Sequence, residues 1–168
     1  IQDDFGVPLG SLTVAIAGAG GGAGQAIATQ CVLLGVERLV LANRSVEKLD
    51  VLVQRLRELG GRTTIRAFPL DDAALVVACL DCDLIVNTSS VGLKPGDPSI
   101  LTAACLKPEH LVYDTIYQPP VTPLLALADQ TGCRAANGKS MLLHQGALAF
   151  QHWFPGTDPL AVMREALG

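Results

Sequence analysis

The stretch that decides the fold is residues 12–28, which read LTVAIAGAGGGAGQAIA. An apolar run, Leu12–Ala17, stops in a series of glycines, and apolar residues resume at helical spacing from about Ala23. A strand that feeds a tight turn and then a helix explains this change, because glycine lets the backbone turn sharply and approach a bound group closely. The amides that open such a helix lie at the positive end of its dipole. The stretch therefore predicts an anion site of a kind that suits a pyrophosphate.

The composition is that of a folded domain with a small partner. The chain has 168 residues, of which 49% are hydrophobic, enough for one domain with a real core. Its net charge of −4 excludes a general attraction to nucleic acid or to an anionic membrane surface, so phosphate recognition must be local. No apolar run approaches the roughly 20 residues that span a bilayer. We therefore expect a cytoplasmic protein without a nucleic-acid or membrane partner.

The five cysteines are odd in number and lie among apolar neighbours. This pattern favours buried thiols in a reducing compartment over a disulfide framework. Cys79 and Cys82 do form a C-x-x-C pair, for which redox or metal chemistry is the alternative. No second pair or nearby histidine completes a metal site, so we expect none.

Apolar runs and helical patterns alternate along the chain. The predicted strands are Leu12–Ala17, Arg38–Ala42, Thr63–Ala67, Leu84–Asn87, Leu111–Asp114 and Cys133–Ala136. The predicted helices are Ala23–Leu34, Val46–Leu59, a short one after Asp71-Asp72 that ends near Leu80, one from a Thr122 cap through Ala128, Ser140–Phe154, and one that starts at Asp158-Pro159. Strands that alternate with helices at short connections predict a doubly wound α/β fold of the Rossmann type. We expect a mostly parallel six-stranded sheet in the order 3-2-1-4-5-6, with helices on both faces.

Two parts of the chain are distinguished. Ile1–Ser11 contains Gly6, Pro8 and Gly10, and is predicted to be a lead-in or linker. Residues 12–168 are predicted to form the dinucleotide-binding domain. Since a cofactor-type turn begins so soon after Ile1, we expect the chain to be part of a longer protein.

The glycine turn matches a G-x-G-x-x-A or a G-x-G-x-x-x-G variant of the dinucleotide fingerprint. Glycine-rich turns also occur for purely structural reasons, but this one lies between a predicted strand and helix inside a complete βαβ unit. The residues expected to cradle the pyrophosphate are Gly18, Ala19, Gly20, Gly21 and Gly22.

The end of the second predicted strand favours NADP(H). NAD enzymes usually place Asp or Glu there for the ribose 2′-hydroxyl, whereas this chain has Asn43-Arg44-Ser45. Arg44 can form two charge-assisted hydrogen bonds with a 2′-phosphate, and Ser45 can cap the next helix. Lys48 falls in the first helical turn, where a cation opposes the helix dipole, which suggests a bound anion. The alternative is that both cations are solvated surface charges.

Polar groups also follow the later strands. Asn87, Thr88 and Ser89 end one strand, and we expect them to contact the nicotinamide ribose; the alternative is strand termination by polar turn formers. Tyr117, in the loop after Leu111–Asp114, is a candidate for facing a substrate or for packing.

Small and polar residues likewise surround the start of the last long helix. Gly138 provides a turn there, and helical spacing puts Met141 and Gln145 on one face. His144 lies on another face, where we expect a surface or packing histidine.

At these positions the sequence resembles the C-terminal, NADP-binding half of the shikimate dehydrogenases and the related quinate/shikimate dehydrogenases. The resemblance covers nearly the whole chain. It rests on residues 18–21, 43–45, 86–89, 113–120 with 122–125, and 137–138 with 141–150. The last two of these groups are more specific than the glycine turn.

The resemblance implies a role in the reduction of 3-dehydroshikimate to shikimate with NADPH. It implies that Gly18–Gly22 cradle the pyrophosphate, that Arg44 meets the 2′-phosphate, and that Tyr117 and Gln145 bind substrate hydroxyls without transferring a proton. The residues that it implies at the nicotinamide end are Asn87, Thr88, Gly138 and Met141. The family keeps its catalytic Lys and Asp in an N-terminal substrate domain, and Ile1–Ser11 does not supply them. We therefore expect this chain to bind cofactor, to share the substrate with that other domain, and to be inactive alone.

The chain departs from the family pattern at two places. The turn has an extra small residue where a basic residue often contacts the 2′-phosphate, so some use of NAD is expected to be possible. Lys139-Ser140 replaces a commoner Leu-Gly. Two alternatives stay open: an NAD-dependent quinate/shikimate dehydrogenase domain, and a non-catalytic domain that senses NADP(H).

Overall fold

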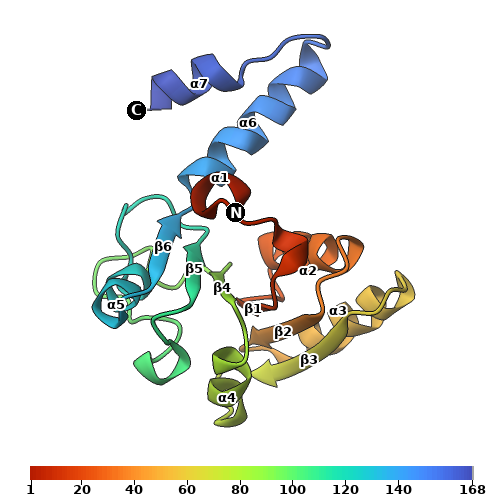
Figure 1. Ribbon diagram of the computed structural model, residues 1–168, viewed down its shortest axis with the longest axis vertical. Coiled ribbons are helices and arrows are strands. Elements are labelled where there is room, and N and C mark those ends of the chain that lie inside the picture. Colours follow the sequence, from red (N-terminus) through yellow and green to blue (C-terminus); the bar gives the residue numbers. More distant parts are fainter. Residues whose placement is uncertain (168) are drawn as a thin grey trace.

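The structure is a computed structural model that describes residues 1–167. Six parallel strands form one sheet in the order β3-β2-β1-β4-β5-β6, which confirms the predicted topology (Figure 1). The strands are β1 Val14–Ala17, β2 Arg38–Asn43, β3 Thr64–Pro69, β4 Leu84–Asn87, β5 Leu111–Asp114 and β6 Arg134–Asn137. The predicted bounds of β4 and β5 are confirmed, whereas β1 begins later than predicted and β3 extends further, to Pro69.

Helices precede, connect and follow the strands. They are α1 Gln2–Phe5, α2 Gly22–Leu33, α3 Val46–Glu58, α4 Ala74–Leu80, α5 Pro123–Thr131, α6 Lys139–Trp153 and α7 Leu160–Leu167, with the 3-10 turns η1 Leu9–Ser11 and η2 Ala103–Cys105. As predicted, Thr122 caps α5, because its hydroxyl oxygen accepts a hydrogen bond from the amide of Leu125 at 3.3 Å. None of the helices within residues 1–167 is both long and apolar enough to cross a membrane.

Each face of the sheet carries its own apolar core. Val14 and Ile16 of β1 point into the core under α2 and α3, and Ala15 and Ala17 point into the core under α4 and α5. Because parallel strands are covered on both faces, such strands are apolar throughout. Helix α3 buries Leu49, Leu52 and Leu56 as predicted. Leu59, which was expected on the same stripe, lies beyond the last helical residue and is 48% exposed.

The N-terminal segment is more structured than a lead-in. It forms α1 and η1, and Phe5 is buried against Tyr113 of β5 in an edge-to-face contact with ring centroids 6.4 Å apart. Arg134 of β6 donates a hydrogen bond from Nη2 to the carbonyl oxygen of Phe5 at 2.8 Å. Residues Ile1–Ser11, for which the sequence predicts a lead-in or linker, pack on the sheet that follows them.

Helices α6 and α7 extend beyond the sheet (Figure 1). Of the residues of α6 only Leu143 and Ala147 are buried, and none of the described residues of α7 is buried. The carboxyl ends of β1, β2 and β4 lie side by side, since Ala17 of β1 pairs with Ala42 of β2 and with Asn87 of β4. The loops that leave the sheet at this edge therefore start side by side.

Candidate functional site

The glycine turn after β1 is held tightly against its neighbours. Gly18 has a φ of +82°, and a Cβ on it would lie 2.8 Å from the backbone nitrogen of Ser89. A Cβ on Gly24 would lie 2.6 Å from Cα of Ala19, so α2 can approach the turn only with glycine there. The structure therefore selects the G-x-G-x-x-x-G variant. Gln25 stabilises the turn, because its Nε2 donates to the carbonyl oxygen of Gly20 at 3.1 Å.

The start of α2 is open to solvent. Gly21, Gly22 and Ala23 are exposed, and a Cβ on Gly22 would meet nothing within 4 Å. Gly21 occupies the N-cap position without a side-chain capping bond, so the first amides of α2 are available to an anion. Ala19 differs from these residues. It is fully buried, and its amide donates to the carbonyl oxygen of Ala42 at 3.1 Å, so its side chain does not face a ligand.

Two exposed cations lie beside this open helix end. Arg44 follows β2, and Lys48 is in the first turn of α3. A Cβ on Gly20 would come within 3.0 Å of Cβ of Lys48, so the lysine leaves the backbone next to the glycine turn. Within residues 1–167 neither cation forms an ion pair. Ser45 is the N-cap residue of α3, but its hydroxyl oxygen accepts no hydrogen bond from a helix amide, so the prediction that its side chain caps the helix was wrong. The hydroxyl donates instead to the Glu47 carboxylate at 2.8 Å.

The side chain of Asn87 is used entirely inside the protein. It is fully buried; its Nδ2 donates to Oδ1 of Asp114 at 3.0 Å and to the carbonyl oxygen of Val91 at 3.3 Å. Its Oδ1 accepts hydrogen bonds from the amide and hydroxyl of Ser89 at 2.9 and 2.8 Å. The side-chain amide of Asn87, which was expected to contact the nicotinamide ribose, therefore shapes the loop after β4. Thr88 is half-buried and donates from Oγ1 to the carbonyl oxygen of Ala17 at 3.0 Å, which joins the ends of β4 and β1.

Asp114, the last residue of β5, organises the same region from the other side. It is fully buried, and its Oδ2 accepts the hydroxyl of Thr122 at 2.6 Å while Oδ1 accepts the amide of Ile116 at 3.0 Å. Burial raises the pKa of Asp114, and its hydrogen bonds, with Thr122 first, oppose that rise. Sequence reasoning assigned no role to Asp114. The available signal was a carboxylate at the carboxyl end of an apolar strand.

The loop after β5 meets the base of α6 at Gly138. A Cβ on Gly138 would lie 2.0 Å from the carbonyl oxygen of Thr115, and the Gly138 amide donates to the carbonyl oxygen of Ile116 at 3.1 Å. This contact joins the loop that carries Tyr117 to the helix that carries Met141 and Gln145. Tyr117 is 49% exposed and Gln145 is exposed, whereas Met141 is half-buried against the core.

The surroundings of His144 and of the cysteines indicate structural roles. His144 lies on the surface as predicted, with its Nε2 2.8 Å from Oδ2 of Asp3. All five cysteines are free, and four of them are buried, as expected for buried thiols. Burial raises the pKa of Cys82 to about 12, so the C-x-x-C pair is not poised for thiolate chemistry. Among residues 1–167 no cluster of three or more His, Cys, Asp or Glu side chains is placed to hold a metal ion.

The family profile and the curated relatives indicate the family of this chain. Residues 138–167 match the profile of the shikimate 5′-dehydrogenase C-terminal domain. The chain is 37% identical over 162 residues to the shikimate dehydrogenase (NADP(+)) of Methanopyrus kandleri, and 40% identical over 155 residues to that of Citrifermentans bemidjiense. This chain belongs to the shikimate dehydrogenase family. The two alignments cover 95% and 92% of this chain but 55% and 53% of the relatives, so the chain spans about half the length of the curated shikimate dehydrogenases that it matches.

Solved structures of this family share the fold. A shikimate 5-dehydrogenase from Listeria monocytogenes, in complex with shikimate and NAD, has a TM-score of 0.89 and 30% identity, over 99% of this chain and 59% of that one. A Thermus thermophilus shikimate 5-dehydrogenase, in complex with NADP(H) and shikimate, has a TM-score of 0.79 and 30% identity, over 99% and 57% of the two chains. A quinate dehydrogenase from Corynebacterium glutamicum, in complex with NAD, has a TM-score of 0.83 and 26% identity, over 98% and 57%.

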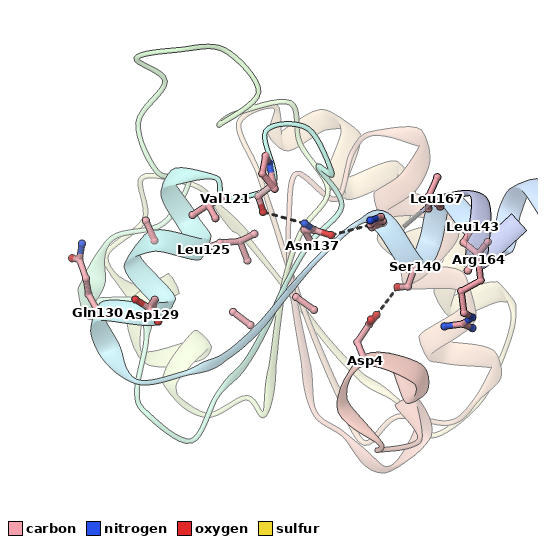
Figure 2. A pocket seen from close by; sticks show the side chains of 15 residues that line it. Asp4, Val121, Leu125, Asp129, Gln130, Asn137, Ser140, Leu143, Arg164 and Leu167 are labelled. Atoms are coloured by element: carbon pink, nitrogen blue, oxygen red, sulfur yellow. Dashed lines mark hydrogen bonds between the residues drawn. The ribbon is translucent and has the colours of Figure 1, made fainter.

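A cavity of about 840 Å³ adjoins this shikimate dehydrogenase fold at the edge strand β6, between α5 and the α6–α7 pair (Figure 2). At its floor Asn137 donates from Nδ2 to the carbonyl oxygen of Pro120 at 3.0 Å and accepts the Lys139 amide at 3.1 Å. The glycine turn does not line this cavity. The predicted anion site, at the exposed start of α2, is therefore separate from the cavity.

Proposed function

We propose that this chain is the NADP(H)-binding part of a shikimate dehydrogenase, an enzyme that reversibly reduces 3-dehydroshikimate to shikimate. One observation carries the proposal: the uncapped, exposed start of α2 lies next to Arg44 and Lys48, two cations without an ion-pair partner in the described chain. Amides and cations together suit a ligand that carries a pyrophosphate and a further phosphate. Curated relatives whose names state NADP(+) support the same cofactor.

The residues present fit the phosphate groups of NADP(H). The amide of Gly22 would bind the pyrophosphate, since the space above Gly22 is free of protein atoms. The amide of Gly21 donates to the carbonyl oxygen of Gly18 at 3.1 Å, so Gly21 would shape the turn beside the pyrophosphate. Gly18 and Gly20 would keep the turn close enough to the sheet for this approach. Arg44 would bind the 2′-phosphate through its planar fork of donors, and Lys48 would add a second positive charge. Asn43 and Ser45 would hold the backbone around Arg44 in shape, because Asn43 Nδ2 donates to the Ser45 carbonyl oxygen at 3.0 Å.

The nicotinamide end would lie over the loops after β4 and β6. Thr88, Ser89, Gly138 and Met141 would surround it, with Asn87 acting indirectly by holding the loop in shape. When bound, NADPH supplies a hydride for the substrate carbonyl carbon. Tyr117 and Gln145 would bind substrate hydroxyl groups, and neither is assigned a proton transfer.

The proton donor would come from another part of the enzyme. We propose that residues 12–168, with residues 1–11 packed on them, form the cofactor domain, and that an N-terminal domain shares the substrate and carries the catalytic groups. The cytoplasm is the compartment that we propose, since the free, buried thiols of this chain suit reducing conditions.

Two alternative functions are each opposed by particular residues of this chain. A quinate dehydrogenase that uses NAD is supported by the Corynebacterium glutamicum neighbour, and Arg44 speaks against it. A domain that senses NADP(H) without chemistry would have no need for substrate-facing groups, whereas Tyr117 and Gln145 are exposed next to the proposed nicotinamide site.

The test is a pair of titrations of the purified chain, one with NADPH and one with NADH. We expect NADPH to bind at least about tenfold more tightly, or about 1.4 kcal/mol. Arg44→Ala should abolish this preference, whereas its matched control Arg62→Ala, which removes an exposed arginine that precedes β3, should leave the ratio unchanged. Equal affinities would contradict the 2′-phosphate assignment and favour the NAD alternative. Absence of binding by either cofactor would contradict the cofactor role altogether.

A further inference from the structure

Helix α6 is weakly fixed by apolar packing. It carries Met141 and Gln145, yet of its residues only Leu143 and Ala147 are buried, and it projects away from the sheet (Figure 1). Two buried side chains hold one side of a 15-residue helix but leave its rotation and tilt poorly determined. Met141 packs partly on the core, and the Gly138 amide holds the base of the helix. Polar contacts further along α6 add to these in setting the direction in which Gln145 points.

Ser140 makes the first of these contacts. Its hydroxyl donates to Oδ2 of Asp4 (Figure 2). Its Oγ also lies 3.1 Å from the hydroxyl oxygen of Tyr113. Because the Ser140 hydrogen is directed to the carboxylate, Tyr113 is the donor in the second bond. Tyr113 is only 4% exposed on β5, so a rigid strand residue, the first turn of α6 and α1 are linked in one chain of hydrogen bonds.

Asp3 makes the second contact, one turn further along α6. Its Oδ2 accepts hydrogen bonds from Nε2 of His144 at 2.8 Å and from Nη2 of Arg164 at 3.1 Å. These two bonds lower the pKa of Asp3, with His144 making the larger contribution. The carboxylate thus joins α1 to α6 and to α7.

Helix α1, to which both contacts lead, is itself firmly held on the sheet. Phe5 of α1 is buried, packs edge-to-face on Tyr113, and receives the Arg134 guanidinium both over its ring, at 5.6 Å from the centroid, and on its carbonyl oxygen. Because α1 is fixed to the sheet in this way, its contacts with α6 hold α6 in a defined orientation relative to the sheet.

We propose that Asp3, Asp4, Ser140 and His144, the α1–α6 clamp, are positioning residues for the nicotinamide end of the cofactor. Ser140 and His144 are one turn apart, as are Met141 and Gln145, and the two pairs lie on adjacent faces of α6 because successive helical residues are rotated by about 100°. Holding the first pair against α1 fixes where the second pair points. The proposal rests on the proposed function, and it gives a role to Ser140, one of the two residues at which this chain departs from the family pattern.

The test compares two nearly isosteric variants, Ser140→Val and Ser140→Thr. Valine removes the hydroxyl and threonine keeps it, while both are β-branched and alter the helix similarly. Each variant is titrated with NADPH and with 2′,5′-ADP, which contains the 2′-phosphate but no nicotinamide. We expect Ser140→Val to weaken NADPH binding by about threefold to tenfold, the range of one lost hydrogen bond, and to leave 2′,5′-ADP binding unchanged. Ser140→Thr should bind both ligands like the unmodified chain.

Asp3→Ala provides an independent variant, because it releases His144 and Arg164 without changing α6. It should show the same selective loss, whereas Asp71→Ala, which removes an exposed carboxylate before α4, should not. Unchanged NADPH binding by both clamp variants would overturn the proposal. An equal loss for both ligands would also overturn it, since that pattern indicates general damage to the domain. If the unmodified chain binds neither ligand, the proposed function itself fails.

Discussion

Substituting Gly138 by alanine tests how closely the base of α6 approaches the loop after β5. The new methyl carbon would lie 2.0 Å from the carbonyl oxygen of Thr115 and 2.6 Å from its carbonyl carbon. Ordinary contact needs roughly 3.5 Å, so the two segments must separate by about 1.5 Å. The obstacle is backbone, which has no rotamer to change. Overpacking typically costs about 1–3 kcal/mol, and we expect Gly138→Ala to destabilise the chain by about 3 kcal/mol.

Thermal unfolding followed by circular dichroism measures this effect. For a domain of this size about 3 kcal/mol corresponds to a decrease in Tm of about 6–12 °C. Gly146→Ala is the matched control on the same helix, since a Cβ there meets nothing within 4 Å. Alanine is favoured over glycine in a helix by roughly 0.5–1 kcal/mol, so this control should raise the Tm slightly. A Tm for Gly138→Ala within about 1 °C of the unmodified chain would refute the close approach, since such a shift corresponds to well under 1 kcal/mol.

Two further predictions concern buried polar groups. Asp114→Ala should destabilise the chain by about 3 kcal/mol or more, because Asn87 and Thr122 lose a charged acceptor. Asp114→Asn should cost less, because its side-chain oxygen can still accept a hydrogen bond. Equal free energies of unfolding in urea for the two variants would contradict this hydrogen-bond network. Burial, with a smaller contribution from Lys107, lowers the pKa of His110 below its unfolded value near 6.5, so the folded state binds fewer protons there. Its contribution to stability is present above about pH 6.5 and is lost as the pH falls. Urea unfolding at several pH values should show a steeper loss on acidification for the unmodified chain than for His110→Asn, and parallel curves would refute it.

Local patterns predicted most of the sheet. The strand order follows from alternating strands and helices joined by short connections, and β4 and β5 end where Asn87 and Asp114 interrupt apolar runs. Thr122 was recognisable as a cap because it precedes Pro123 at the start of a helical pattern. The glycine turn was recognisable because its spacing serves both the turn and the packing of α2.

Long-range contacts account for what the sequence did not predict. The glycines and proline of Ile1–Ser11 are typical of a linker, and nothing local shows that Phe5 packs on Tyr113. The position of Asn87 at a strand end is typical of a ligand-contacting residue, but its side-chain amide points inward because it donates to Asp114, 27 positions later. Ser45 is a local exception: it has the right position for a cap, but its hydroxyl is turned to donate to the carboxylate of Glu47, two residues later.

The most direct test of the account is the coupling between Arg44 and the 2′-phosphate. Calorimetric titration of the unmodified chain and of Arg44→Ala, each with NADPH and with NADH, completes a thermodynamic cycle. Arg44→Ala should weaken NADPH binding about tenfold or more, a coupling of about 1.4 kcal/mol, and should leave NADH binding nearly unchanged. A coupling near zero, with both cofactors affected equally or not at all, would contradict the assignment of this chain as a holder of NADP(H).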